Sequence, residues 1–413
     1  MKRGPASALG ILVAITGAAA TPARAEPDLF SRDTVSGVVD LRLATASGAT
    51  SWIDNGLAKS RFGSNRGGLR LGEAAVVWNP RFSDSLSAVF VGESQDGQDH
   101  IVDLGEAYLA YRGPSGGAWR VSGRAGAFYP QISLEHDGLD WTVPDTITPS
   151  AINTWVAEET KVVAFEATAR GAVLGQGLSA TAGLFTHGDT SGTLLAFRGW
   201  ALHDLKSPAT GRFPLPPLSA FMARRQARST TPLREIDGKR GVYGRLEWRP
   251  DSRLTLDLFG YDNGGDRISV EDLEWSWETR FWNLGARLDL GRTQLRAQVM
   301  RGETLMGYSN ANGVWVDTGF EAAYVSATRS WGPGSATARL DHFSISDRTN
   351  KAVDNTAEHG WSALAAYRWD LRPDTQIVFE AMTIQGGRPS RRQLGLAPDY
   401  DQAVLQTAYR RQF

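Results

Sequence analysis

The stretch Asn283-Leu284-Gly285-Ala286-Arg287-Leu288-Asp289-Leu290 alternates between two kinds of side chain. On an extended chain the apolar side chains share one face, namely Leu284, Ala286, Leu288 and Leu290. The opposite face carries Asn283, Arg287 and Asp289. The pair Gly291-Arg292 that follows is typical of a tight turn. This period of two predicts a β-strand with one apolar and one charged face.

The same alternation recurs from Thr34 onward, and no sustained helical stripe interrupts it. Short turn segments follow seven of the runs, after Trp78, Arg112, Arg170, Trp248, Leu290, Trp331 and Leu371. Eight longer segments lie between them, roughly 46–67, 94–101, 129–161, 187–240, 262–277, 302–319, 344–360 and 386–400. Seven turns and eight loops predict sixteen antiparallel strands.

The alternation of short and long connections favours a transmembrane β-barrel over a soluble sandwich, whose connections are similar at both ends. An even strand number places both chain ends beside the short periplasmic turns, opposite the long extracellular loops. The segment Thr193–Leu202 is apolar enough to be a strand, so eighteen strands are the alternative. We expect 129–161 to fold inward and 187–240 to be one long external loop.

The composition excludes several other classes of protein. The chain has no cysteine, which rules out disulfides, thiolate zinc sites and cysteine nucleophiles. Charged residues make up 22% of it, too many for a bundle of membrane helices. Its formal net charge of −1 gives no global argument for binding nucleic acid.

The first 25 residues have the pattern of a secretory signal peptide. Lys2 and Arg3 precede an apolar stretch over 6–20, and Ala23-Arg24-Ala25 offers a small-x-small cleavage site. The alternative is a membrane anchor, but the apolar run is shorter than the ~20 residues that span a bilayer. We therefore expect residues 26–413 to form a single barrel domain in the outer membrane of a Gram-negative bacterium.

Aromatic residues support the membrane assignment. Five tryptophans lie beside the short turns, as in an interfacial girdle: Trp78, Trp119, Trp248, Trp331 and Trp369. The chain ends in an alternating strand with aromatic side chains at Tyr409 and Phe413. This ending resembles the C-terminal signal by which the outer-membrane barrel assembly machinery recognises its substrates, so that machinery is an expected partner.

A barrel of this size encloses a lumen that we expect to be filled with water, so a passive pore is the expected function. The alternation turns eight arginines inward: Arg42, Arg120, Arg124, Arg245, Arg287, Arg296, Arg339 and Arg368. The expected constriction loop, 129–161, carries the acids Glu135, Asp137 and Asp140. Acids on this loop opposite arginines on the wall predict a transverse field across the constriction.

The run Gly126-Ala127-Phe128-Tyr129-Pro130-Gln131-Ile132-Ser133-Leu134-Glu135 resembles the phosphate-selective porin O and P family, and it leaves the fifth strand at the same place. The resemblance covers about ten residues, chiefly Phe128 and Pro130 through Glu135. It implies a sixteen-stranded, usually trimeric porin for phosphate-like anions. Phosphate-specific members line their constriction with lysines, whereas this chain has only six lysines, so phosphate specificity does not carry over.

The remaining signals are weaker. The excess of arginine and lysine over 206–240 can attract anions or the phosphates of lipopolysaccharide. The turn Asp262-Asn263-Gly264-Gly265-Asp266 lacks the full series of calcium ligands, and whether it binds calcium is left open. Gly113-Pro114-Ser115-Gly116-Gly117 matches G-x-S-x-G without the helix that a nucleophile elbow requires. We expect no cofactor and no metal.

Together these patterns predict a non-enzymatic porin for small hydrophilic solutes, with a mild preference for anions and no nucleic-acid partner. A homotrimer is possible on the resemblance alone. The alternatives are a barrel enzyme that hydrolyses lipids or peptides and a non-conducting structural barrel.

Overall fold

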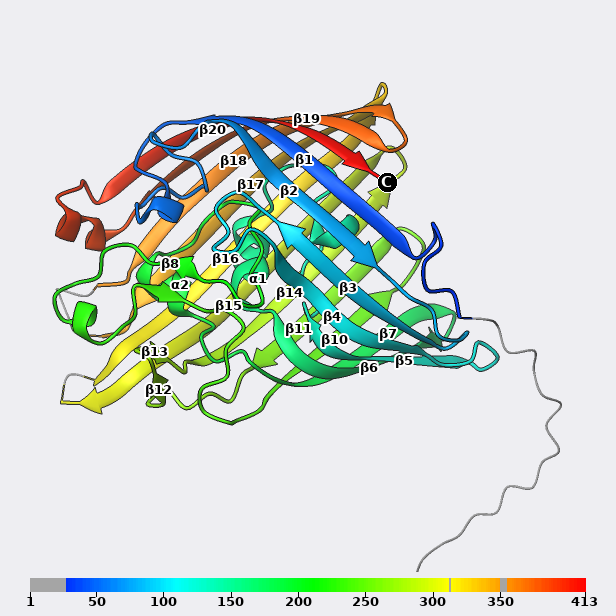
Figure 1. Ribbon diagram of the computed structural model, residues 1–413, viewed down its shortest axis with the longest axis horizontal. Coiled ribbons are helices and arrows are strands. Elements are labelled where there is room, and N and C mark those ends of the chain that lie inside the picture. The colour runs from blue at the N-terminus through cyan, green and yellow to red at the C-terminus, as the bar shows by residue number, and fades with distance from the viewer. Residues whose placement is uncertain (1–26, 312, 350–354) are drawn as a thin grey trace, which may run out of the picture.

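Sixteen antiparallel strands form a closed barrel in the computed structural model (Figure 1), which describes residues 27–311, 313–349 and 355–413. The expected signal peptide lies outside the described residues. In barrel order the strands are β1 (Val35–Ala46), β2 (Gly68–Trp78), β3 (Leu86–Ser94), β4 (Asp103–Arg112), β5 (Trp119–Phe128), β6 (Val162–Val173), β7 (Gln176–Thr186), β10 (Gly241–Arg249), β11 (Leu254–Asp262), β14 (Glu278–Leu290), β15 (Thr293–Asn310), β16 (Gly313–Trp331), β17 (Gly334–Asp347), β18 (Glu358–Arg372), β19 (Thr375–Gly387) and β20 (Asp399–Gln412). The predicted strand number is confirmed.

The barrel closes where the last strand pairs with the first. β20 runs antiparallel to β1 from the pair Val38 and Gln412 to the pair Ala46 and Val404. Beyond this ladder the amide of Phe413 donates to the carbonyl of Gly37, so pairing continues to the final residue. Closure gives each strand two neighbours, which removes the free sheet edges that hydrocarbon does not tolerate.

The connections follow the predicted alternation. All seven predicted short turns join hairpins, and the C-terminus lies at their end of the barrel (Figure 1). The segment 302–319 is the exception among the predicted loops, because β15 and β16 extend through it and leave only residues 311 and 312 between them. Their inward alternation continues through the buried side chains Thr304, Met306, Val316 and Thr318, which extends the hairpin beyond the neighbouring strands.

The segment Thr193–Leu202 is not a barrel strand. It forms the short helix α2 (Thr193–Phe197), and the chain after it is extended and buried as far as Ser207. The alternative of eighteen strands is therefore wrong. The structure also differs from the expectation of one external loop over 187–240, because Arg42 on the barrel wall pairs with Asp204 inside this segment.

Smaller elements complete the described chain. The helix α1 (Ala151–Glu159) lies in the chain between β5 and β6. Two short hairpins lie outside the barrel sheet, β8 (Phe213–Pro214) with β9 (Ser229–Thr230) and β12 (Val270–Glu271) with β13 (Glu274–Trp275). The 3-10 helices are η1 (Trp52–Asp54), η2 (Leu139–Trp141), η3 (Met222–Arg224) and η4 (Pro389–Leu394).

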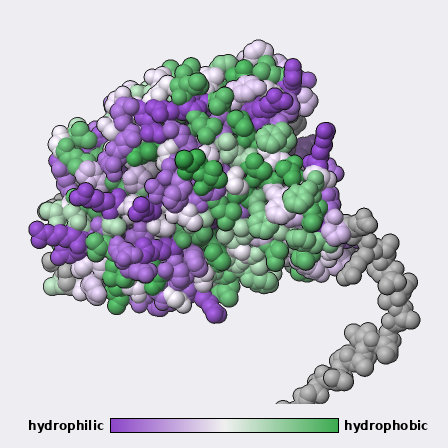
Figure 2. Space-filling model, viewed as in Figure 1, coloured by the Kyte–Doolittle hydropathy of each residue, from purple (hydrophilic) through white to green (hydrophobic). Residues whose placement is uncertain are grey.

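The outer face of the barrel is apolar, as predicted. Leu284 and Leu340 are 50% and 58% exposed although each lies within a strand. The five predicted girdle tryptophans lie at strand ends beside the short turns, where Trp331 is 69% exposed. Figure 2 shows hydrophobic residues over the strands and hydrophilic residues gathered at the long-loop end. None of the helices in the described part of the chain is long and apolar enough to cross a membrane.

A lipid-facing apolar band makes the cost of a charge depend on its depth. Leu284 and Leu290 point outward from β14 and are each 50% exposed, but Leu290 is the last residue before the short turn. We expect Leu284→Arg to lower the free energy of unfolding by ~2–4 kcal/mol and the matched Leu290→Arg by ~0–1 kcal/mol. Urea unfolding in lipid bilayers measures both values. Equal costs at the two positions would contradict a membrane-embedded outer face.

Candidate functional site

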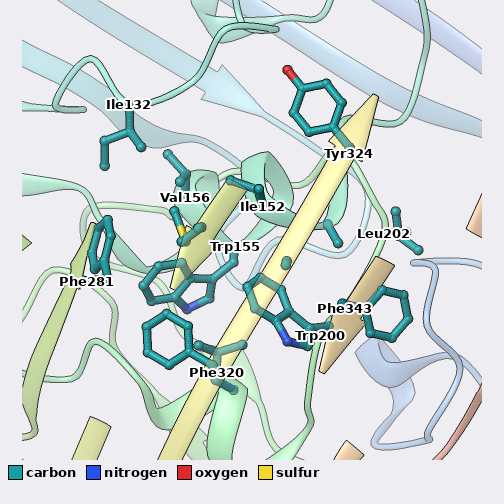
Figure 3. Packing of buried hydrophobic residues seen from close by; sticks show 14 of the residues in the cluster. Ile132, Ile152, Trp155, Val156, Trp200, Leu202, Phe281, Phe320, Tyr324 and Phe343 are labelled. Carbon is teal, nitrogen blue, oxygen red and sulfur yellow. The ribbon is translucent and has the colours of Figure 1, made fainter. Parts of the chain in front are cut away.

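Two segments from the long-loop end fold back into the barrel, residues 129–161 and 189–207. All nine residues of α1 are buried, and Ser150 caps the helix by accepting a hydrogen bond from the amide of Asn153. In the second segment Leu194 and Trp200 are also fully buried. Figure 3 shows α1 surrounded by side chains from the barrel wall and from this second segment. The candidate site is therefore the lumen and the surfaces that these segments leave open.

A glycine sets the point at which the chain leaves β5 for the lumen. Gly126 has a φ of +140°, and a Cβ there would lie 2.2 Å from the carbonyl oxygen of Ala107. Only glycine adopts this conformation without strain. The amide of Tyr129, the first residue after β5, donates to Glu106 of β4, which fixes the start of the loop. The recognised run 126–135 thus has a structural role in bending the chain.

Aromatic packing fills the long-loop half of the lumen. The ring of Trp155 lies 5.1 Å from Phe281 and 5.2 Å from Phe320, centroid to centroid, and Trp200 lies 6.1 Å from Phe320. Phe281 and Phe320 belong to β14 and β16 and point inward (Figure 3). The expectation of a wholly water-filled lumen is wrong for this half, because the inward face of these strands is apolar where the two segments pack.

Wall arginines hold the first segment through direct ion pairs. Arg339 lies 3.2 Å from Glu135 and donates to the carbonyl oxygen of Thr148. Arg296 and Arg368 both contact Asp145, at 3.2 and 2.9 Å. Further along, Arg287 contacts Asp137 at 2.7 Å, and Arg296 also lies 3.5 Å from Asp137. Each contact joins the loop to the strand beside it.

These pairs change the predicted electrostatics of the lumen. The alternation along the strands predicts loop acids and wall arginines on opposite sides of an open gap. In the structure Glu135 and Asp137 touch wall arginines, so the charges of these pairs largely offset each other at a distance. The transverse field across the constriction stays a prediction. A loop that lies against the wall was not foreseeable from the period of two, which fixes the face of a residue but not what lies opposite it.

The other predicted wall arginines pair with acids of the wall or of the second segment, with one exception. Arg42 contacts Asp40 and Asp204, Arg124 contacts Glu166, and Arg245 contacts Glu247 and Asp257. The exception is Arg120, for which the described residues supply no carboxylate within ion-pair distance. Whether these arginines line a conducting path stays a prediction.

The loop acid Asp140 contacts a lysine of the second segment. The Nζ of Lys206 lies 2.6 Å from Asp140, 2.9 Å from Glu73 and 3.1 Å from Glu93. Burial by itself lowers the pKa of Lys206, but the three carboxylates raise it well above its ordinary value. The lysine therefore stays charged and ties the two inward segments to β2 and β3.

A second buried cluster joins α1 to the chain after α2. Arg198 binds both oxygens of Glu158 at 2.6 Å in a bidentate pair. The Nδ1 of His203 accepts from the amide of Leu205, so its proton lies on Nε2, which is 2.7 Å from Glu158. Arg198 lies 4.8 Å over the ring of Trp52. Burial raises the pKa of Glu158, but Arg198 and His203 outweigh burial and lower the pKa to about 2.

An open cavity lies on the other side of the lumen, at the short-turn end. Its volume is about 1280 Å³, and it is bounded by residues of the β2–β3, β4–β5 and β6–β7 hairpins. Five arginines line it: Arg81, Arg112, Arg120, Arg124 and Arg170. Gln131 of the first inward segment also lines it, so this cavity begins where the packed half of the lumen ends.

Several of these residues were missed by the sequence analysis. Arg170 directly precedes a short turn, but it also follows Glu166 and Thr168 in the inward phase of its strand, and this phase is the signal that could have identified it. Arg112 precedes a short turn in the same way. The partnership of Glu158 with Arg198 had no sequence signal, since it joins residues that lie in two different inward segments.

A possible cation site is formed by carboxylates near the long-loop end. The ligand oxygens of Asp189, Glu235 and Asp237 lie within 4.8 Å of one another. Backbone amides occupy them in part, because Asp189 accepts from Ile236 and Asp237 and Glu235 accepts from Gly238. The turn that the sequence left open as a calcium site uses its acids differently, since Asp262 pairs with Arg280.

The described residues contain no arrangement for acyl transfer. His136 contacts Ser133 at 2.8 Å, but this hydroxyl accepts from the amides of Glu135 and His136 in a local turn. His203 is occupied by Glu158 and Leu205. A triad needs a histidine that joins a hydroxyl and a carboxylate through its two nitrogens, and the contacts of the described histidines do not provide this.

The fold is similar to that of solved outer-membrane proteins. The outer membrane channel DcaP of Acinetobacter baumannii has a TM-score of 0.55 and 10% identity, over 94% of this chain and 98% of that chain. An anion-selective porin from Comamonas acidovorans has a TM-score of 0.51 and 13% identity, over 94% and 100%. The trimer form of OmpT, an outer membrane protein of Vibrio cholerae, has a TM-score of 0.50 and 8% identity, over 94% and 100%.

No family model matches the sequence, and no curated protein matches it. At these identities the likeness shows the fold alone. A closed barrel of sixteen strands with an apolar outer face is the fold of porin-like proteins in the outer membrane of Gram-negative bacteria.

The bidentate pair in the packed half should be energetically coupled. We expect Arg198→Met to lower the free energy of unfolding by ~3–5 kcal/mol, because it leaves Glu158 buried without its main partner. Adding Glu158→Gln to Arg198→Met should recover most of this loss. A double-mutant cycle by urea unfolding in bilayers measures the coupling, and additive effects would contradict the pairing.

Acid should weaken the same cluster. A carboxyl whose pKa falls from 4.5 to about 2 on folding contributes stability that is complete above pH 4.5 and is lost as pH falls toward 2. We therefore expect Glu158→Gln to flatten the pH dependence of the unfolding free energy between pH 4.5 and 2. Glu271→Gln, at an exposed position, is the matched control. An unchanged slope in Glu158→Gln would contradict this role of Glu158.

Proposed function

We propose that the protein is an outer-membrane porin that passes small hydrophilic solutes by diffusion, with a mild preference for anions. The observation that carries this proposal is the barrel itself, closed and apolar outside, with an arginine-lined cavity of about 1280 Å³ inside. A channel protein requires apolar side chains that face lipid and polar side chains that face its interior.

The proposed path runs beside the two inward segments. The aromatic cluster packs against the long-loop half of the wall, with rings from β7, β10, β11, β14 and β16, whereas the cavity is lined by β3–β6 and the short turns beside them. The residues that bound a path on that side include Gln131, Arg124 and Tyr108. Since much of the lumen is packed, the conductance should be small for a barrel of sixteen strands.

The anion preference rests on charges that are not cancelled. Arg124 is neutralised by Glu166, but Arg120 has no carboxylate partner among the described residues. The lining of the cavity holds five arginines against Asp28, Asp84 and Glu166. A positive surplus raises the local concentration of anions. The neighbour from Comamonas acidovorans is described as anion-selective, which agrees with the proposal.

The proposed partners follow from the outer surface. The C-terminal strand, with Tyr409 and Phe413 exposed, would be read by the barrel assembly machinery. The bilayer and lipopolysaccharide would surround the apolar band and its charged rim. Further copies of the chain would pack at an open groove of small side chains across β16–β20, which includes Ala338, Ala365 and Ala403. These partners, and a trimer among them, belong to the proposal.

A second function is favoured by one observation. The packing of Trp155 and Trp200 against the wall suits a sealed, non-conducting barrel as well as a narrow pore. Conductance separates the two functions. A barrel enzyme has no comparable support, because the described histidines lack the arrangement that acyl transfer requires.

Planar-bilayer recording tests the pore and its selectivity together. We expect stepwise ohmic currents from the purified chain and a reversal potential in a potassium chloride gradient that favours chloride. Arg120→Ala should reduce this preference, because it removes an uncancelled charge, whereas Arg253→Ala in the neighbouring short turn should not. Absence of current would favour the sealed barrel, and a cation-favouring reversal potential would overturn the anion preference.

A further inference from the structure

Three arginines converge on the cavity from three adjacent strands. The register of β5 and β6 places Arg120 directly opposite Arg170, and that of β4 and β5 places Arg112 opposite Ser122. Arg112, Arg120 and Arg170 all line the cavity and are exposed to it. We call this set the arginine triangle.

The arginine triangle differs from the rest of the inward wall. The other seven wall arginines named above each lie within 3.5 Å of a carboxylate, whereas no described carboxylate pairs with Arg112, Arg120 or Arg170. Among the described residues, the side chain of Arg170 donates a hydrogen bond to the hydroxyl of Ser179, at 3.4 Å. Like charges directly opposite each other destabilise a strand pair, so Arg120 and Arg170 leave a repulsion that an anion would relieve.

Hydroxyl groups occupy the next positions on the same inward faces. Ser122 is paired in register with Thr168, and the hydroxyl of Thr168 contacts that of Thr181 on β7 at 2.8 Å. Below them Arg124 and Glu166 form a closed ion pair at 2.8 Å. The arginine triangle thus lies next to the hydroxyls of Ser122 and Thr168. The neighbouring pair of Arg124 and Glu166 is already neutral, so an anion can bind to the arginine triangle without breaking an ion pair.

Size and charge limit the anion that fits. The cavity lining carries five arginines and three acids, a surplus of two positive charges. Adjacent strands are about 5 Å apart, so the backbones of Arg112 and Arg170 are separated by about 10 Å across two strand spacings. Because Arg112 is level with Thr168, two residues from Arg170, they are also offset by about 7 Å along the strands, which makes about 12 Å in all. A single small oxyanion contacts few of these groups at once, and the cavity of about 1280 Å³ is far larger than such an ion. A solute with several separated carboxylates matches both the spacing and the charge.

We propose that the arginine triangle, with Ser122 and Thr168, is a binding site for a small organic polycarboxylate. Each guanidinium binds a carboxylate through two parallel hydrogen bonds, and the hydroxyls bind the remaining oxygens of the solute. The site would make polycarboxylates the solutes that this channel concentrates at its short-turn end. That role rests on the proposed channel function, whereas binding itself does not.

Isothermal titration of the full chain in detergent with citrate tests the site at low ionic strength. We expect one citrate per chain. Arg120→Gln/Arg170→Gln removes two guanidiniums and should raise the Kd for citrate by tenfold or more. A single hydrogen bond to a charged group already accounts for about a tenfold change in Kd. Arg112→Gln is a second, milder variant in case the double variant does not fold. Arg253→Gln removes one charge, as Arg112→Gln does, from the short turn between β10 and β11, outside the lining of the cavity, and should bind like the parent chain.

Acetate and inorganic phosphate complete the design. Both should bind at least tenfold more weakly than citrate, because neither spans the arginine triangle. Phosphate binding as tight as that of citrate would overturn the polycarboxylate assignment, and equal losses in Arg253→Gln and Arg120→Gln/Arg170→Gln would overturn the site. Citrate binding without conductance in bilayers would contradict the proposed channel function and support the binding site. Conductance without citrate binding would support the channel function and contradict the binding site.

Discussion

Every part of this structure depends on the need of backbone amides for hydrogen-bond partners in hydrocarbon. A strand in lipid has no water to bond, so the sheet must close, and here the ladder between β1 and β20 closes it as far as Phe413. Closure fixes which face of each strand meets lipid. On β14 the outward residues Leu284 and Leu290 are half exposed, while Phe281 on the opposite face is buried. The alternation along one strand therefore decides both the membrane contact and the contents of the lumen.

Inside, the lumen has two regions of different character. In the long-loop half, Trp155, Phe281 and Phe320 pack as in the core of a soluble protein, and Glu158 is buried with Arg198. Burying the charge of Glu158 is tolerated there because Arg198 neutralises it. At the short-turn end, Arg120 and Arg170 face each other without such partners. The contrast between paired and unpaired arginines separates the groups that hold the inward segments from those free to contact a solute.

The sequence predicts the barrel well because the signal is local. The period of two, as at Leu284 to Leu290, shows which face of a strand is apolar. The seven short turns, each with a glycine or a proline, give the number of strands. The path of a loop is not local. Thr193–Leu202 is apolar enough to be a strand, yet it becomes α2 and a buried segment because the inward aromatic face of β14–β17 offers it a partner. The alternation along β5 predicts that Arg120 points inward, and the same alternation along β6 predicts this for Arg170. The pairing of Arg339 with Glu135 was not, since it depends on where the loop lies.

The central claim is that one face of each strand meets lipid while the other is packed or faces the cavity. A nitroxide scan along β17 in bilayers tests it most directly, using collisions with oxygen and with a water-soluble nickel chelate. The account predicts that labels at Ala336, Ala338 and Leu340 collide with oxygen far more than labels at Thr337, Arg339 and Asp341, which are buried. A scan without this period of two, or with the phase reversed, would contradict it.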